Sequence, residues 1–384
     1  MAKSAVLEVK EGKIRQAVNG FLKDLFAKNV VEAMLVPLAH SAGTNVVQAL
    51  IADAAAVDKA DVFAPVMPVN SAKILQAMTR LTPADRKIAV VIRPCEMRAV
   101  VELVKLKQIQ TENLLFVSID CPGAYSVKDY PKFVADKKTS DDFVKTGYKW
   151  ADDQLLRSGC QICEYPYPLA ADISIGMIGL EPDKGMLLQA DTVRGEEALK
   201  ALGIAVEADS AAAQKRQAAL TKLGAGVKER RKKFFAKTKE EVGGLEKLTQ
   251  VFAACIKCQN CRVACPVCYC RECVFISPTF ELEADKYLRQ AEKKGSMRMP
   301  ADTLLFHLTR MNHMANSCVG CGACEEACPN DIPLLKLFQL TGSEVQELFE
   351  YVPGRSIDEP LPASAFREKE FGWIGEKDDS KAHH

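Results

Sequence analysis

The chain has 384 residues, of which 48% are hydrophobic and 26% are charged. Because 51 Lys and Arg nearly balance 50 Asp and Glu, the net charge of +1 gives no global positive field for nucleic acid. The amino-terminal residues contain no apolar stretch long enough for a signal peptide, and no apolar run reaches membrane-spanning length. We therefore expect the 15 cysteines to be reduced metal ligands in the cytoplasm.

The amino-terminal half predicts alternating helices and strands. Apolar positions at helical spacing predict helices, and short apolar runs bounded by turn residues predict buried strands. Helices are expected over 13–28, 71–81 and 96–107, and strands over 32–38, 88–92, 114–119, 172–177 and 186–193. A strand, a helix and a strand at this spacing favour a parallel α/β unit.

Two cysteines directly follow buried strands of this unit, Cys95 after the strand 88–92 and Cys121 after the next one. The carboxyl ends of neighbouring parallel strands share one crevice, so we expect these thiols to lie close together. Cys160 and Cys163 supply a further pair, and four such cysteines would complete a 4Fe-4S cluster. Alternatively, the first two are ordinary buried thiols and the CxxC pair is a dithiol or half of a zinc site.

The segment between these elements and the carboxyl-terminal half has two parts. Residues 124–157 are polar and predict an irregular surface excursion. Residues 195–240 are rich in Ala, Lys and Glu and predict a helical connection, which contains the basic stretch 228–237. We interpret this stretch as the solvent-exposed face of a helix. The alternative is a binding site for an acidic partner or for the phosphates of a nucleotide cofactor.

Two four-cysteine runs dominate the carboxyl-terminal half, each with the spacing Cys-x2-Cys-x2-Cys-x3-Cys-Pro. This spacing is typical of bacterial two-cluster ferredoxins, in which the fourth cysteine of each run binds the other cluster. One cluster is then expected on Cys255, Cys258, Cys261 and Cys328, and the other on Cys318, Cys321, Cys324 and Cys265. Paired CxxC units also bind zinc, but zinc sites rarely show three thiols at this spacing before Cys-Pro.

Three cysteines remain, Cys268, Cys270 and Cys273, directly behind Cys265. Exposed thiols this close to a cluster would be open to oxidation. They predict either a further metal site, with His307 or His313 as an outside ligand, or a replacement for Cys265 in the ferredoxin pattern. The sequence leaves both alternatives open.

Several of these motifs together resemble one protein family. Residues 88–98 and 120–123 are similar to the Pro-Cys and Cys-x-Gly elements of the coenzyme F420 hydrogenase/dehydrogenase beta subunits. The pair Cys160 and Cys163, followed by residues 171–176, resembles the CxxC…ADIS-x-G signature of that family. Residues 265–273 resemble its formate dehydrogenase beta subunits, which carry two fused ferredoxin motifs.

The resemblance implies FAD beside the cluster of the amino-terminal half. In the family a glycine- and serine-rich segment contacts the flavin, and residues 65–73 occupy the corresponding place here. Asn70, Ser71 and Lys73 are therefore candidate flavin contacts. The alternative is that Asn70 or Ser71 caps the amino terminus of a helix.

The predicted fold is an α/β (α+β) flavin and cluster domain over 1–200, a helical linker over 201–248, an α-helical two-cluster ferredoxin-like module over 249–345 and a tail over 346–384. The resemblance implies an oxidoreductase subunit of an anaerobic complex. A protein of this kind converts hydride transfer with coenzyme F420 into electron relay with a formate dehydrogenase, a hydrogenase or a heterodisulfide reductase-type partner. The alternatives are a flavin-less relay adaptor and, more remotely, a zinc-binding interaction protein.

Overall fold

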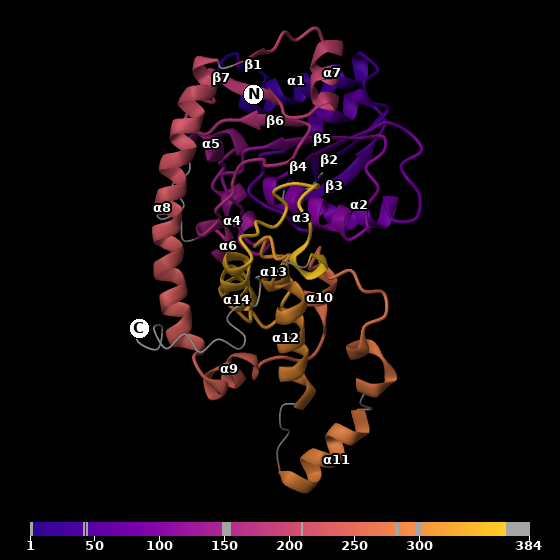
Figure 1. Cartoon of the computed structure of the whole chain (residues 1–384), viewed down its shortest axis with the longest axis vertical. Helices are drawn as coiled ribbons and strands as arrows, with labels where there is room; N and C mark the ends of the chain where they lie inside the picture. Colours follow the sequence, from indigo (N-terminus) through magenta and orange to yellow (C-terminus); the bar gives the residue numbers. More distant parts are fainter. Residues whose placement is uncertain are drawn as a thin grey trace.

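The computed structural model describes residues 3–40, 43, 45–147, 155–208, 210–280, 284–295 and 301–365. A sheet-bearing amino-terminal part lies above a helical carboxyl-terminal part in Figure 1. The predicted fold class, an α/β domain joined by helices to a helical module, is confirmed. None of the described helices is long and apolar enough to cross a membrane.

One mixed sheet of eight strands forms the amino-terminal part, in the order β3-β2-β4-β5-β6-β7-β1-β8. The inner strands β2, β4, β5 and β6 run parallel, and the remaining pairs are antiparallel. Every residue of β4 and β5 is buried, as expected for parallel strands covered on both faces. The strands are Lys3–Glu8, Ala33–Ala39, Val46–Ile51, Ile88–Ile92, Leu114–Ile119, Ile173–Gly176, Gly185–Ala190 and Glu207–Ala208 for β1 to β8.

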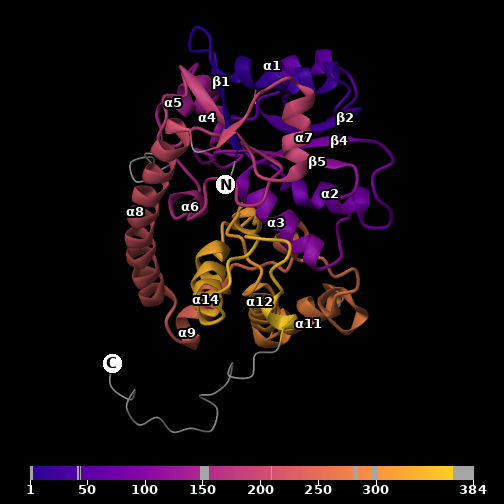
Figure 2. The same ribbon diagram turned by 45° about the horizontal axis from the view of Figure 1, so that its top comes forward.

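Seven helices belong to the described part of this half. They are α1 (Ile14–Ala27), α2 (Ser71–Thr79), α3 (Pro94–Lys105), α4 (Tyr130–Ala135), α5 (Ser140–Lys145), α6 (Ser158–Gln161) and α7 (Val193–Ala201). Helix α3 lies at the boundary between the sheet and the helical part (Figures 1 and 2). It therefore links the end of β4 to the second half of the chain.

The prediction that residues 124–157 form an irregular surface excursion was wrong for the described part of that range. Tyr125, Tyr130, Phe133 and Phe143 are buried, and α4 and α5 carry three of them. The ring centroids of Tyr125 and Phe143 lie 5.4 Å apart in an edge-on arrangement. Charged residues separate these aromatic residues in the sequence. Because a short helix buries only one narrow stripe of its surface, its apolar periodicity is too brief to predict it.

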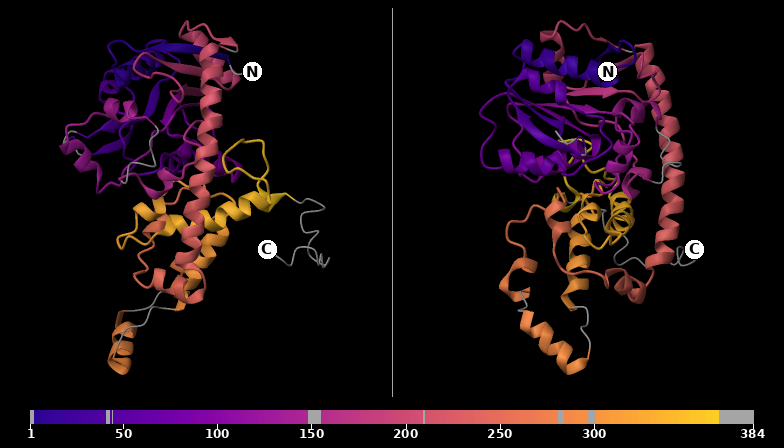
Figure 3. Two further views of the ribbon diagram at one scale, coloured as in Figure 1. Left: turned by 90° about the vertical axis from the view of Figure 1, so that its left-hand side faces the viewer. Right: turned by 180° about the vertical axis from the view of Figure 1, so that it is seen from behind.

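Helix α8 (Ala211–Val242) runs along both halves of the molecule (Figures 1 and 3). Near its start, Arg216 forms a buried ion pair with Asp120 at the end of β5. Further along, the buried Arg231 donates to the carbonyl of Ile162 at 3.2 Å. Most of the basic stretch is exposed, as favoured from the sequence, although Arg231 instead points into the interior.

The helical part comprises α9 (Leu245–Phe252), α10 (Asn260–Ala264), α11 (Ala284–Lys294), α12 (Ala301–Met314), α13 (Ala323–Glu326) and α14 (Leu334–Leu348). Its core contains Phe252, Phe275, Phe306 and Phe338, against which several of the motif cysteines pack. Helix α11 projects from the body in both views of Figure 3. The tail was predicted over 346–384, and its part from 366 onward lies outside the described residues.

Candidate metal centres and the adjoining pocket

The four cysteines of the amino-terminal half meet in one pocket between the two parts of the molecule. Cys95, Cys121, Cys160 and Cys163 all line it, and so does Cys321 of the second ferredoxin motif. Cys95 lies in the first turn of α3 after β4, and Cys121 follows β5 directly. The crevice at the carboxyl ends of parallel strands thus gathers the two pairs, as the sequence predicted.

Local backbone geometry explains how the second pair reaches this crevice. Gly123 has a φ of +116°, and a Cβ there would lie 2.8 Å from Leu156 and 3.6 Å from the Cβ of Cys160. Only glycine combines this backbone conformation with so close an approach. The loop after β5 can therefore lie against α6, which carries Cys160.

Burial raises the pKa of these thiols. It raises the pKa of Cys163 to about 12 and, with repulsion from Glu96 and the neighbouring thiols, that of Cys95 well above its usual value. Buried thiolates require compensating positive charge, and a bound iron cluster would supply it, since metal binding displaces the thiol proton. Arg93 adds a guanidinium, whose Nη1 donates to Cys121 Sγ at 3.4 Å. This donor set fits a 4Fe-4S cluster.

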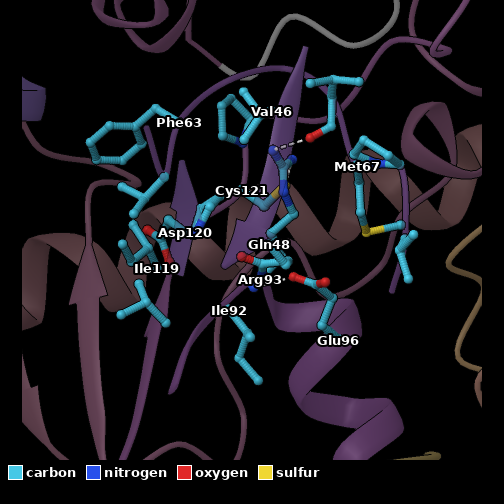
Figure 4. Close-up of a pocket in the computed structure, with 17 residues that line it drawn as sticks. Val46, Gln48, Phe63, Met67, Ile92, Arg93, Glu96, Ile119, Asp120 and Cys121 are labelled. Carbon is cyan, nitrogen blue, oxygen red and sulfur yellow. Dashed lines mark hydrogen bonds between the residues drawn. The ribbon is translucent and has the colours of Figure 1, made fainter. Parts of the chain in front are cut away.

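A second pocket adjoins the first at the ends of β4 and β5 (Figure 4). Met67, Arg93 and Cys121 line both pockets. Figure 4 shows the Arg93 side chain beside Cys121, and its Nη2 donates to the carbonyl of Val66 at 3.1 Å. Gln48 on β3 also lines this second pocket, and its buried Oε1 has no hydrogen-bond partner among the described residues.

The three candidate flavin residues do not line this pocket. Asn70 caps α2 by accepting from the Ala72 amide at 3.0 Å, which is the alternative noted from the sequence. The Ser71 hydroxyl donates to the Glu96 carboxylate at 2.6 Å. Lys73 lies instead near Cys265 and Cys268, whose charges oppose the lowering of its pKa by burial. The part of the segment that does line the pocket is 66–69.

The first ferredoxin set also lines a single pocket. Cys255, Cys258, Cys261 and Cys328 lie around it, with the fourth cysteine contributed by the other run. Burial raises the pKa of Cys261 to about 11, whereas Cys258 is exposed at the surface. This arrangement matches the exchange of fourth ligands expected from the spacing.

The cysteines of the second set influence one another's pKa. Burial and, to a smaller extent, the charges of Cys265 and Cys318 raise the pKa of Cys321 to about 12. Burial likewise raises the pKa of Cys324 well above its usual value, with Cys265 as the largest neighbouring charge. Because Cys321 also lines the pocket of the amino-terminal cysteines, two candidate centres share one boundary.

The three surplus cysteines are not gathered around a histidine. Cys270 is exposed, and Cys268 lies near Cys265. His307 directs its Nε2 to Cys255 Sγ at 3.3 Å and stacks on Phe252, and His313 is exposed. The expectation that either histidine completes a site with these cysteines therefore finds no contact to support it.

A single metal ion needs its ligands closer together than a cubane does, because each cysteine of a cubane binds a different iron atom. Among the described residues, no group of three or more His, Cys, Asp or Glu is arranged around a single-ion position.

Sequence reasoning missed two kinds of residue. Arg310 on α12 donates to Cys261 Sγ at 3.0 Å, and Gln48 lines the second pocket. No local motif marks either residue. Arg310 lies within the long insert between the cysteine runs, and its burial is seen only in the structure.

Comparisons with known proteins agree with this arrangement. Residues 85–216 match the family described as the carboxyl terminus of the coenzyme F420 hydrogenase/dehydrogenase beta subunits, and residues 227–332 match a 4Fe-4S dicluster domain. The chain is 33% identical over 328 residues to the F420-dependent formate dehydrogenase subunit beta of Methanocaldococcus jannaschii, covering 77% of this chain and 79% of that protein. It is 28% identical over 318 residues to the F420-dependent formate dehydrogenase 1 subunit beta of Methanococcus maripaludis, covering 72% and 75%.

Among solved structures, a chain of the F420-reducing NiFe hydrogenase complex from Methanosarcina barkeri matches with a TM-score of 0.45 and 14% identity. The match covers 64% of this chain and 94% of that chain. The dicluster match confirms the prediction of two 4Fe-4S clusters in the helical part. The individual ligands and the third cluster remain predictions.

Proposed function

The chain belongs to the family of coenzyme F420 hydrogenase/dehydrogenase beta subunits, and on that premise we propose that it is the electron-transferring subunit of an F420-dependent formate dehydrogenase or related complex. We propose an organisation with a cluster and flavin domain over 1–200, a linker over 201–248, a two-cluster module over 249–345 and a tail over 346–384. We propose that it works in the cytoplasm of an anaerobic cell, where thiols stay reduced.

The observation that carries this proposal is the unbroken series of thiol-lined sites. The pocket beside Gln48 shares Arg93 and Cys121 with the pocket of the amino-terminal cysteines. The pocket of the amino-terminal cysteines in turn shares Cys321 with the second ferredoxin set. Single electrons can pass along such a series of neighbouring clusters without a mobile carrier.

We propose that the pocket at the ends of β4 and β5 holds the flavin. The unpartnered Oε1 of Gln48 suits an N–H donor on the edge of a flavin ring. Arg93 holds the wall of this pocket by donating to the Val66 carbonyl and, at 3.0 Å, to that of Gly123. When bound, a flavin supplies the exchange between hydride transfer and single-electron transfer.

The partner is proposed to be the catalytic subunit that reacts with formate or hydrogen, or a heterodisulfide reductase-type subunit. A flavin-less adaptor is the second candidate, because Asn70, Ser71 and Lys73 lie outside the pocket. The two candidates differ in whether extracted cofactor includes FAD and whether the protein alone reduces F420.

The test is anaerobic purification with metal and flavin analysis. We expect about twelve irons, as three four-iron clusters, and one FAD per chain. Replacing Cys160 with Ser should reduce iron to about eight, whereas Cys270→Ser, at an exposed position outside the sets, should leave it unchanged. Clusters without FAD would favour the adaptor, and stoichiometric zinc without iron would exclude both.

A further inference from the structure

The insert between the two cysteine runs supplies helix α12, and one face of that helix meets the first ferredoxin set. His307 and Arg310 lie one turn apart on this face. His307 contacts Cys255, and Arg310 contacts Cys261. The predicted ligands of one cluster are thus contacted by two side chains that lie outside both motifs.

Arg310 is the more deeply engaged of the two, with only 4% of its surface exposed. Its Nη1 donates to Cys261 Sγ at 3.0 Å, and its Nη2 donates to the Cys261 carbonyl at 3.1 Å. The guanidinium carbon lies 4.9 Å from the ring centroid of Phe338 and 5.5 Å from that of Phe306. These two rings and the two hydrogen bonds fix the position of the cation.

Among the described residues, the charged groups that act most strongly on Arg310 are thiols, and none of them is a carboxylate. A buried cation without a counter-ion is strongly unfavourable, so a negative group must compensate it. The thiols of Cys261, Cys265 and Cys324 are the neighbouring groups that carry negative charge when they ligate iron. They belong to both ferredoxin sets, which places the cation beside both clusters.

A fixed positive charge stabilises whichever state of a cluster holds the additional electron. Hydrogen bonds to cluster sulfurs act in the same direction, and both effects raise the reduction potential. The effect is strong in the interior, where the dielectric screening is weak. Only Cys261 receives a direct hydrogen bond from Arg310, so the first cluster should be affected more than the second.

We propose that Arg310 is a positioning residue that raises the reduction potentials of both clusters of the helical part, and that of the first cluster more. This inference rests on the ligand sets of the proposed function. The first cluster also has the exposed ligand, Cys258. Its raised potential would favour electron flow from the buried second cluster toward the molecular surface.

The experiment is a redox titration of the anaerobically purified full chain, with the reduced clusters followed by electron paramagnetic resonance. In Arg310→Gln we expect both midpoint potentials to shift to more negative values, with the larger shift for the first cluster. Arg310→Lys keeps the charge but cannot keep both contacts to Cys261, so the first cluster should shift by less and the second hardly at all. Arg289→Gln is the matched control, because that exposed arginine pairs only with Asp285 on α11.

Unchanged midpoints in an iron-replete Arg310→Gln protein would overturn the inference and leave the proposed function intact. If Arg310→Gln fails to retain iron, the test passes to Arg310→Lys. A first-cluster midpoint potential in Arg310→Lys equal to that of the parent would then count against the inference. A parent protein without iron would instead contradict the proposed ligand sets. Shifts as large in Arg289→Gln would show that net charge alone is responsible, which also overturns it.

Discussion

Arg98 Nη1 donates a 3.2 Å hydrogen bond to the carbonyl of Val319, which ties helix α3 to the loop between Cys318 and Cys321. The same guanidinium donates from Nε to the carbonyl of Pro353 at 2.7 Å. Arg98 is 6% exposed, so both contacts are buried. One side chain therefore joins the helix that begins beside Cys95 to two segments of the helical part.

We expect Arg98→Met to weaken this junction. The substitution leaves two buried carbonyls without their donor, which costs about 1–3 kcal/mol per group. Thermal unfolding should occur at lower temperature, and reduction of the ferredoxin clusters through the amino-terminal cluster should slow in rapid-mixing experiments. Arg86→Met is the control, since Arg86 is exposed and pairs only with its neighbour Asp85. Equal rates and stabilities for both variants would contradict this role.

A second prediction concerns Gly159 on α6, which lies against the helical part. A Cβ at this position would lie 2.6 Å from Leu335 Cδ2 and 2.9 Å from the Gly320 carbonyl oxygen. We expect Gly159→Ala to separate the segment carrying Cys160 from the loop carrying Cys321, because a backbone oxygen cannot move aside as a side chain can. Iron content and the rate of electron transfer between the clusters should both fall.

Gly20→Ala is the matched control for that substitution. Gly20 lies within α1, and nothing lies within 4 Å of a Cβ built there. Alanine in a helix interior is favoured over glycine by about 0.5–1 kcal/mol, so this variant should be as stable as the parent or more stable. A Gly159→Ala protein that behaved like Gly20→Ala would show that the close contact has no role.

The sequence identified the elements whose pattern is local. The strands 88–92 and 114–119 are found at the predicted residues, because an uninterrupted apolar run between turn residues is typical of a buried parallel strand. Cys95 and Cys121 follow them as expected and line one pocket. The ferredoxin spacing likewise predicted which cysteines surround the pocket that includes Cys328.

What the sequence did not reveal depends on contacts between distant segments. Strand β1 pairs antiparallel with β7, and β3 pairs antiparallel with β2. Both strands mix polar and apolar residues, so neither contains the continuous apolar run that would predict a buried strand. Asn70 was compatible with a flavin contact and with a helix cap, and the structure shows that it caps α2. The contact between Arg310 and Cys261 joins residues 49 positions apart and leaves no periodic signal.

A third prediction follows from the buried ion pair between Asp120 and Arg216. Arg216 Nη2 donates to Asp120 Oδ1 at 2.7 Å, and Asp120 also accepts from the amides of Met177 and Ile178 at 2.7 and 2.9 Å. Replacing Arg216 with Gln leaves a buried carboxylate without its counter-ion, which costs roughly 3–5 kcal/mol. We expect a markedly lower denaturation midpoint and partial loss of iron, since Asp120 precedes Cys121.

The double variant Asp120→Asn with Arg216→Gln provides the control for this pair. It removes both charges, so the penalty of an isolated buried carboxylate disappears, and it should be more stable than Arg216→Gln alone. If the two variants unfold at the same denaturant concentration, the loss does not arise from the unpaired charge.

The last prediction concerns pH and Asp61, which lies two residues before Phe63 in the wall of the second pocket. Asp61 is 7% exposed, accepts from the Ser140 hydroxyl at 2.6 Å and lies 3.6 Å from the Arg15 guanidinium. Burial raises the pKa of Asp61 above its usual value, although the Ser140 hydrogen bond and the Arg15 charge oppose the increase. The folded protein therefore holds this proton to higher pH than the unfolded chain does.

The sign of the pH dependence follows from this difference in proton binding. Below the ordinary Asp pKa of about 3.9 both states are protonated, and Asp61 does not bias the equilibrium. As the pH rises through and above that value, the unfolded chain releases the proton first, so the contribution of Asp61 to stability falls until the folded state also ionises. Asp61→Asn cannot ionise, so its unfolding temperature should rise relative to that of the parent between pH about 4 and neutrality. Asp58 is exposed and pairs with Lys23, so the unfolding temperature of Asp58→Asn should follow that of the parent at every pH. If the curve of Asp61→Asn also ran parallel to that of the parent, the Asp61 carboxyl would already be ionised in the folded state over this pH range.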